Sequence, residues 1–164
     1  MEIRKVTPED DFEAIGDIYA RSWKAAYRGI VPQDYLDELK GSTWVPILTD
    51  SRYDSRVITD AGAYVGTSAV CAARDEKMAG WGEIVSIYLL PEYFGRGYAA
   101  PLLEHAVGAL AEGGYERVYL WVLLENIRAQ RFYEKHGFQK NGDVASLTVA
   151  GKELTEVRYV RKIC

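Results

Sequence analysis

The 164-residue sequence has few of the residues that build metal sites and disulfide frameworks, with two cysteines and two histidines. Cys71 lies in an apolar run and Cys164 is the last residue, so the pair has neither a metal-ligand spacing nor a disulfide pattern. We expect two free thiols. No histidine near Cys71 suggests thiolate activation, and we interpret Cys71 as a small core residue. The sequence therefore predicts no metal site and no cysteine nucleophile.

Long apolar runs and an excess of basic charge are also missing. No uninterrupted apolar stretch approaches the roughly 18 residues of a membrane helix, and residues 1–5 lack the apolar region of a signal peptide. The formal net charge is -4 and Lys and Arg are scattered, whereas sequence-independent nucleic-acid binding needs a basic face. We therefore expect a cytoplasmic protein that binds neither nucleic acid nor membrane.

The composition is that of an ordinary globular protein. Hydrophobic residues make up 48% and charged residues 27% of the chain, which excludes disordered and collagenous classes. The length falls within the usual range for one domain, and neither repeats nor linkers interrupt it. We predict a single domain over residues 1–164.

Apolar periodicity and turn residues predict an alternation of helices and strands. In the helix expected from Pro8 to Tyr27, with Thr7 as cap, apolar residues recur at intervals of three and four. The other helices are expected at 33–39, near 44–48, and at 98–112 and 126–135, and strands at 2–6, 56–59, 63–73, 83–90, 117–124, 138–149 and 153–161. Gly137 supplies the left-handed residue that commonly closes a helix. This order predicts an α+β domain around a mixed, mainly antiparallel sheet of about seven strands.

One turn of this pattern is suited to binding an anion. The run Phe94-Gly95-Arg96-Gly97-Tyr98-Ala99 follows a buried strand and opens a helix. Its glycines remove side-chain obstruction, so successive backbone N–H groups can converge on a phosphate. Taken alone, the run is equally typical of a structural tight turn.

The next helix carries a second and more specific pattern. Asn126 and Tyr133 are seven residues apart and therefore lie on nearly the same helical face, in the run from Asn126 to Phe138. Together with residues 91–103, this run closely resembles the two hallmark motifs of the GNAT superfamily, the general-control-related N-acetyltransferases. The resemblance is strong over residues 80–138 and looser elsewhere.

The resemblance implies a binding site for acetyl-coenzyme A. The family's phosphate loop corresponds to Gly95, Arg96, Gly97, Tyr98, Ala99 and Ala100, which would act mainly through backbone N–H groups. Phe94 departs from the family, which commonly has Gln or Arg at that position. By the same resemblance, backbone groups of Ile87 and Leu89 would bind the acetyl carbonyl and the pantetheine arm, and Asn126 would contact pantetheine or organise the site. Burial in a strand also explains Ile87 and Leu89, and Asn is a favoured helix cap.

The resemblance also implies a direct transfer to an amine, with no covalent enzyme intermediate. Tyr133 matches the family tyrosine that protonates the departing thiolate, although an aromatic residue on the core face of a helix is the alternative. Glu83 matches a position at which several members have a base, and a partly buried carboxylate with a raised pKa would serve. Glutamates at strand ends are, however, often solvated.

The N-terminal helices would roof the acceptor pocket in such a fold. Trp23, Tyr27 and Tyr35 are candidates for substrate contact, because aromatic walls suit apolar or cationic ligands. Helical spacing explains Trp23 and Tyr27 equally well as packing residues. The acceptor is expected to be a small-molecule amine or a peptide amine. A non-catalytic acyl-coenzyme A sensor and a protein N-terminal acetyltransferase stay open as alternatives, and a homodimer is compatible with the sequence.

Overall fold

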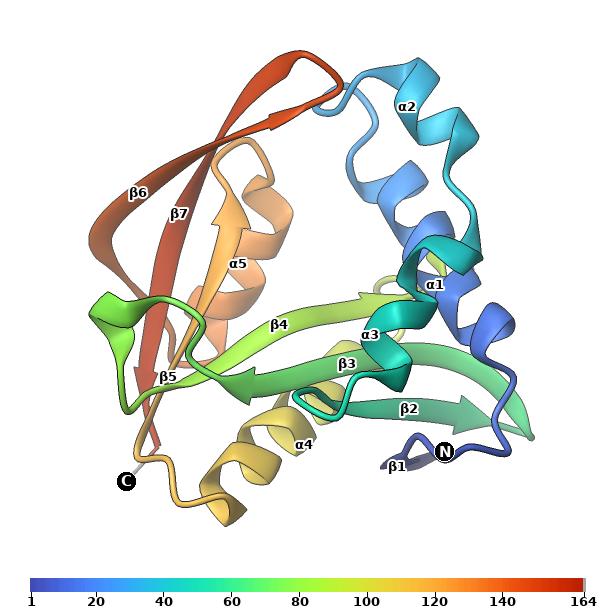
Figure 1. The fold of residues 1–164 in the computed structure, drawn as a ribbon, viewed down its shortest axis with the longest axis horizontal. Coiled ribbons are helices and arrows are strands. Elements are labelled where there is room, and N and C mark those ends of the chain that lie inside the picture. Colours follow the sequence, from blue (N-terminus) through green and yellow to red (C-terminus); the bar gives the residue numbers. More distant parts are fainter. Residues whose placement is uncertain (164) are drawn as a thin grey trace.

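The computed structural model describes residues 1–163, which are built around one seven-stranded sheet (Figure 1). The strand order is β1-β2-β3-β4-β5-β7-β6, and every neighbouring pair is antiparallel except β4 and β5. The strands are β1 (Glu2–Lys5), β2 (Asp54–Asp60), β3 (Ala63–Ala72), β4 (Gly82–Leu89), β5 (Arg117–Leu123), β6 (Gln139–Val149) and β7 (Lys152–Lys162). The predicted fold class is confirmed.

In the described part of the chain, residues 1–163, five α-helices and three short 3-10 helices join and cover these strands. They are α1 (Phe12–Ala26), α2 (Gln33–Glu38), η1 (Gly41–Trp44), α3 (Val45–Thr49), η2 (Glu76–Met78), η3 (Pro91–Tyr93), α4 (Ala99–Glu112) and α5 (Ile127–Lys135). Gly137 follows α5 at φ +86°, as the sequence predicted for a residue that ends a helix.

The start of α1 differs from the prediction that Thr7 caps a helix at Pro8. Asp11 is the cap, and its side chain accepts a hydrogen bond from the Ala14 N–H (3.0 Å). The preceding residue, Asp10, accepts hydrogen bonds from the Thr7 N–H (2.8 Å) and from Arg4 (2.7 and 2.9 Å). These contacts hold residues 7–10 in a turn against β1, so the helix begins four residues later than predicted.

Helices cover both faces of the sheet. The side chains of α4 that face the sheet pack with inward residues of β4, β5 and β7, and the fully buried members include Leu103, Val118 and Tyr159. The other face is covered by α1, whose Tyr19 packs on Trp44 and Tyr88. We call these two sides the α4 face and the α1 face. Burying apolar side chains on both faces stabilises the central strands, which are apolar along most of their length.

A bulge in β4 decides which of its side chains point to which face. The pairing with β3 runs Ala69↔Ser86 and then Val70↔Ile84, so Val85 has no partner. Ser86 bonds to Tyr19 of α1 (2.9 Å), whereas Ile84 packs against α4. The extra residue places the odd-numbered Glu83 on the same α1 face as the even-numbered Ser86.

The parallel pair β4 and β5 separates soon after it forms. Only Gly82↔Val118 and Glu83↔Tyr119 are paired, and beyond them the two strands diverge, as Figure 1 shows. Backbone groups on the facing edges of both strands are thereby left without the partners that a continuous sheet would give them. The divergence opens a gap in the middle of the sheet.

Candidate active site

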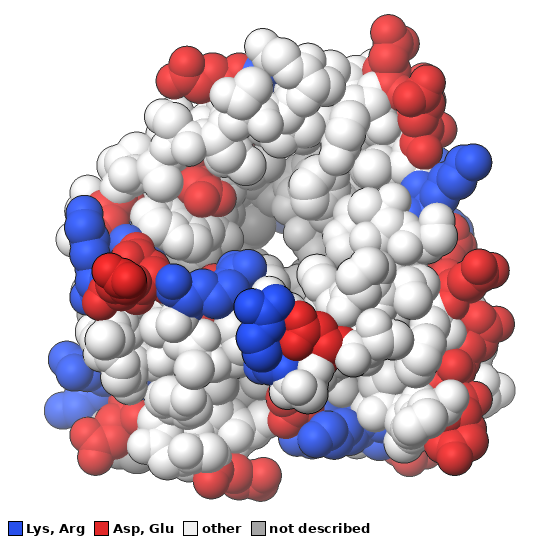
Figure 2. Space-filling view, in the orientation of Figure 1, with Lys and Arg blue, Asp and Glu red and all other residues white. Residues whose placement is uncertain are grey.

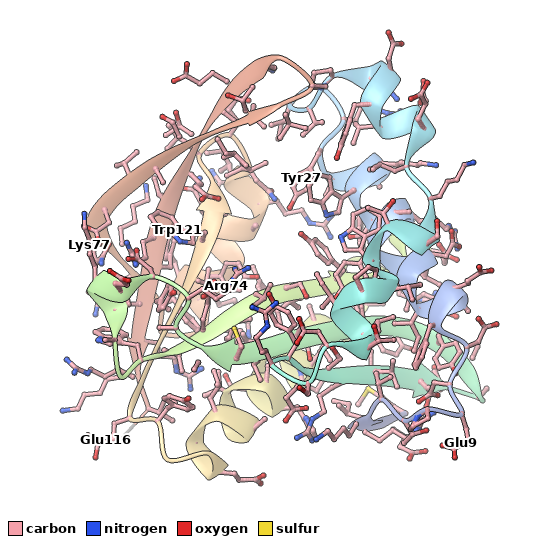
Figure 3. The ribbon with its side chains drawn as sticks, viewed as in Figure 1. Glu9, Tyr27, Arg74, Lys77, Glu116 and Trp121 are labelled. Atoms are coloured by element: carbon pink, nitrogen blue, oxygen red, sulfur yellow. The ribbon has the colours of Figure 1, made fainter. Side chains whose placement is uncertain are left out.

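A cavity of about 380 Å³ occupies the gap between the diverging strands. Its lining combines Trp23 of α1 and Tyr27, the residue that ends α1, on one face of the sheet, with Phe132 and Tyr133 of α5, on the other. It therefore passes through the sheet. Figure 2 shows the hollow near the middle of the molecule, with charged side chains along its lower border, and Figure 3 shows Tyr27, Arg74 and Trp121 around it. A volume of this size suits a small-molecule site.

The inner edge of β4 offers free backbone groups to this cavity. Leu90 donates its N–H to Val65 O (2.8 Å), which makes 65↔90 a hydrogen-bonded pair in the antiparallel ladder. Such pairs alternate with pairs that do not exchange hydrogen bonds. Ser68↔Ile87 and Gly66↔Leu89 are therefore of the second kind, and the N–H and C=O groups of Ile87 and Leu89 point toward the gap. Both residues line the cavity.

The loop before α4 presents a row of unpaired N–H groups at the edge of the cavity. The Phe94 N–H donates to Pro91 O (3.1 Å) and the Leu102 N–H to Tyr98 O (3.4 Å), but within residues 1–163 the N–H groups of residues 95–100 have no protein acceptor. Gly95 and Gly97 have φ +70° and +88°, and a Cβ on either would meet nothing within 4 Å. The loop is thus an open cradle at the amino end of a 14-residue helix, which favours an anion.

The side chains of this loop turn away from the cradle. Arg96 donates to Glu92 O (3.2 Å) and lies over the Tyr93 ring, and the Tyr98 hydroxyl donates to Asp60. Gly95 and Ala99 line the cavity, whereas Arg96, Gly97, Tyr98 and Ala100 lie outside its lining. Contacts from the loop would therefore come mainly from the backbone.

A cation lies beside Phe94, at the position where the family commonly has Gln or Arg. The guanidinium of Arg128, on α5, lies over the Phe94 ring with its carbon 4.6 Å from the ring centroid, and both residues line the cavity. Sequence reasoning missed Arg128, because its approach to Phe94 joins two segments that are 34 positions apart.

The α5 motif brings Asn126 and Tyr133 to the same cavity, as the seven-residue spacing predicted. Asn126 caps the helix, with its Oδ1 accepting from the Ala129 N–H (3.2 Å), so the cap reading is correct and coexists with a place in the cavity wall. The Tyr133 hydroxyl has no hydrogen-bond partner among the described residues. Burial raises the pKa of Tyr133 well above its usual value, and the phenol is therefore protonated at neutral pH.

Glu83 lines the cavity but is held by its neighbours. Arg74 donates to it from Nη2 (2.6 Å), Nε (3.1 Å) and the backbone N–H (3.1 Å), and the Tyr119 hydroxyl donates at 2.8 Å. Burial alone would raise the pKa of Glu83, but these donors outweigh it and the pKa is lowered. The raised pKa expected from the sequence is therefore wrong. The sequence did not indicate that Arg74, nine positions away, contacts the carboxylate of Glu83.

Aromatic side chains form the roof of the cavity on the α1 face. Trp23 and Tyr27 pack edge to face at 4.9 Å, and the Tyr27 hydroxyl bonds to that of Tyr88 (3.2 Å). The Trp23 Nε1 atom is buried without a hydrogen-bond partner. Trp23 and Tyr27 thus pack against neighbouring side chains and also line the cavity. Tyr35 is 37% exposed and does not line the cavity, so its predicted place in the roof is wrong.

A second carboxylate, missed from the sequence, also lines the cavity. Glu156 lies on β7 opposite Leu123 of β5, on the same strand face as Leu154. Burial raises the pKa of Glu156; Arg74 opposes this effect, the negative charge of Glu83 adds to it, and Arg158 opposes it. The sequence of β7 hardly indicates which of its side chains face the cavity, since both faces of this strand carry apolar and charged residues.

Within residues 1–163, no group of three or more His, Cys, Asp or Glu side chains could hold a metal ion. Cys71 is buried and free, and burial raises the pKa of its thiol to about 11. Cys164, the other predicted free thiol, lies outside the described residues. No helix within residues 1–163 is long and apolar enough to cross a membrane.

The sheet thus parts between β4 and β5, with an anion cradle beside the parting. Residues 12–138 match the Acetyltransferase (GNAT) family, so the chain belongs to this family. It is 31% identical over 137 residues to a Mycobacterium bovis protein named as an uncharacterized N-acetyltransferase, covering 80% of this chain and 85% of the relative. The predicted activity, acetyl transfer from acetyl-coenzyme A to an amine, is confirmed at the level of the family.

Two further relatives come from Thermoplasma acidophilum. A spermidine N(1)-acetyltransferase is 26% identical over 151 residues, which is 85% of this chain and 88% of that protein. The crystal structure of a PaiA N-acetyltransferase in complex with coenzyme A has a TM-score of 0.76 with 22% identity, and covers 98% of both chains. The similarity to this crystal structure shows the fold over 98% of this chain.

Proposed function

We propose that residues 1–164 form one N-acetyltransferase domain that moves the acetyl group of acetyl-coenzyme A directly to a primary amine. The observation that carries this proposal is the cavity that passes through the sheet, because it lets two substrates approach one point from opposite faces. Holding both reactants in one site lowers the entropic part of the barrier. The sheet extends from Glu2 to Lys162, which supports a single domain.

Coenzyme binding is assigned to the α4 face. The unpaired N–H groups of residues 95–100 suit the pyrophosphate, and open space beside Gly95 and Gly97 lets phosphate approach the backbone. The free backbone edge at Ile87 and Leu89 suits the peptide-like pantetheine arm, and Asn126 forms the opposite wall. Bound acetyl-coenzyme A would supply the thioester, whose acetyl group passes to the amine while coenzyme A leaves as the free thiol.

The acceptor is assigned to the α1 face, between Trp23 and Tyr27 on one side and the carboxylates on the other. An ammonium group must lose a proton before it can attack a carbonyl, and Glu83, directly or through water, is the proton acceptor predicted from the sequence. Tyr133 then donates a proton to the departing sulfur, for which its protonated and unpartnered hydroxyl is suited. Backbone N–H groups of β4 stabilise the negative charge on the carbonyl oxygen.

The acceptor class follows from the charges of the wall. Of the two carboxylates in the wall, Glu83 is paired with Arg74, whereas Glu156 has no ion-pair partner within residues 1–163, and its free charge beside the aromatic rings favours a cationic amine. The other cation of the lining, Arg128, lies over Phe94. The relative named as a spermidine N(1)-acetyltransferase supports a small molecule over a protein N-terminus. The cytoplasmic location and a homodimer stay predictions.

Release of free thiol from acetyl-coenzyme A tests this function. The purified protein is mixed with acetyl-coenzyme A and, in turn, with panels of polyamines, amino acids, aminoglycosides and short peptides. Thiol release that depends on an acceptor, together with the acetylated product by mass spectrometry, is expected for at least one small amine. Stabilisation by coenzyme A with no acceptor-dependent thiol release across the panels would favour the sensing module instead.

A further inference from the structure

Two carboxylates lie in the acceptor half of the cavity, and their surroundings differ. Both oxygens of Glu83 are taken up by donors from Arg74 and Tyr119. Glu156 has no hydrogen-bond donor and no ion-pair partner within residues 1–163. A carboxylate that already accepts several hydrogen bonds is a weak base, whereas the free lone pairs of Glu156 are open to a ligand.

The position of Glu156 fits contact with the acceptor. It pairs with Leu123 at the carboxyl end of β5, beyond the point where β4 and β5 part. Its charge also acts on the hydroxyl of Tyr27, which belongs to the roof on the α1 face. Glu156 therefore lies between the aromatic roof and the gap, where an amine would meet the thioester.

The charges facing Glu156 leave it available. Arg74 is paired with Glu83, and Arg158 of β7 is paired with Asp75 (2.8 Å) and lies 3.1 Å from Asp143. Arg74 and Arg158, the cations that act on Glu156, are thus each taken up by other carboxylates, which leaves the negative charge of Glu156 without a paired cation. An ammonium ion would compensate this charge, whereas an anionic acceptor would add to it.

We propose that Glu156, and not Glu83, holds the ammonium group of the acceptor and takes its first proton. This proposal rests on the acetyl transfer proposed above. The carboxylate of Glu156 accepts one N–H proton, the nitrogen lone pair forms the C–N bond, and the C–S bond breaks. The second N–H proton replaces the one that Tyr133 gives to the sulfur, and Glu156 releases its proton to solvent through the open cavity. Glu83 acts as a positioning residue that fixes Arg74 and Tyr119.

The pH dependence of kcat/KM for three variants separates the two carboxylates. Glu156→Gln is compared with Glu83→Gln and with Glu153→Gln, which removes an exposed carboxylate from the same strand. With the fastest panel amine at pH 6.5, Glu156→Gln is expected to lose roughly a hundredfold or more in kcat/KM, the usual effect of losing a general base. The loss should shrink toward pH 9, where more of the amine is already neutral, and Glu153→Gln should match the wild type.

A weakly basic nucleophile gives a control within the same protein. Hydroxylamine is largely neutral at pH 7.5 and needs no base to free its lone pair, so its acetylation should be much less sensitive to Glu156→Gln. Unchanged thermal stabilisation by coenzyme A shows that the variant keeps its fold and coenzyme site. The proposal is overturned if Glu156→Gln has the pH profile of the wild type. It is also overturned if the loss of kcat/KM at low pH appears in Glu83→Gln and not in Glu156→Gln.

If no panel amine is acetylated, the proposed transferase function is refuted, but the ammonium site at Glu156 is not. A titration then tests the ammonium site by itself. The carboxyl signals of protein labelled with ¹³C-glutamate are followed by NMR against pH, with coenzyme A bound and with or without n-butylamine. A signal that is absent in Glu156→Gln and whose midpoint falls when n-butylamine is added is expected. A Glu156 signal that n-butylamine leaves unmoved refutes the ammonium site.

Discussion

Replacing Tyr133 by phenylalanine removes one hydroxyl and leaves the ring. In the structure the ring packs against Phe132 (5.3 Å) and Phe138 (5.7 Å), and both contacts survive the change. The hydroxyl has no hydrogen-bond partner among the described residues, so the free energy of unfolding should change by less than about 0.5 kcal/mol.

The effect on catalysis should be much larger. If the phenol protonates the departing sulfur, its loss should lower kcat by roughly a hundredfold or more, the range expected for a positioned acid. A hundredfold loss corresponds to about 2.7 kcal/mol in the activation free energy. The affinity for coenzyme A should stay nearly unchanged, because the cradle at residues 95–100 lies on a different element.

Tyr159→Phe is a matched control for the assay. The Tyr159 hydroxyl is buried on the α4 face, donates to Glu134 (3.1 Å) and does not line the cavity. Its removal should lower the free energy of unfolding by about 0.5–1.5 kcal/mol while kcat stays at the wild-type value.

Steady-state kinetics with a chemically rate-limited acceptor, and urea unfolding of each variant, measure both effects. A more activated thioester should partly restore Tyr133→Phe, because a better leaving thiol needs less protonation. A kcat for Tyr133→Phe within twofold of the wild type would refute the acid role and leave Tyr133 as a packing residue.

Three other predictions follow from backbone geometry and charge. Gly97→Val should abolish the thermal stabilisation of the protein by acetyl-coenzyme A, because the valine side chain fills the cradle. The control is Gly80→Val, since Gly80 has a similar φ of +87° and equally open surroundings; this variant should be strained to a similar extent but still be stabilised by acetyl-coenzyme A. An equal loss of this stabilisation in both variants would contradict the cradle. Gly16→Ala should lower the free energy of unfolding by about 1–3 kcal/mol in urea titrations, because its Cβ would overlap the backbone of η1, and an unchanged midpoint would contradict this close packing. The Arg4 guanidinium holds the pKa of Asp10 well below its usual range, so the ionised Asp10 carboxylate stabilises the fold. This contribution is complete at pH 7 and is lost as the pH falls below about 4. The difference in unfolding free energy between the wild type and Asp10→Asn should therefore narrow from pH 7 to about pH 2, and a constant difference would refute the ion pair's contribution.

The order of elements, the loop at residues 95–100 and the shared helical face of Asn126 and Tyr133 could be predicted from the sequence. Apolar periodicity, the turn glycines and the spacing of Asn126 and Tyr133 are local patterns, and local patterns are decided by neighbours a few positions away. The strands, α4 and α5 accordingly lie within a few residues of their predicted bounds. The start of α1 was wrong because contacts of Asp10 with β1 compete with the cap expected at Thr7.

The part of the cavity proposed to hold the acceptor was decided only by the tertiary structure. The bulge at Val85 sets the face to which Glu83 points, and the approach of Arg74 and Tyr119 lowers its pKa where the sequence favoured a raised one. Glu156 reaches the cavity from β7, more than 70 positions from Glu83. Proton affinity depends on burial and on charges a few ångströms away, and these come from chain segments whose proximity no local pattern contains.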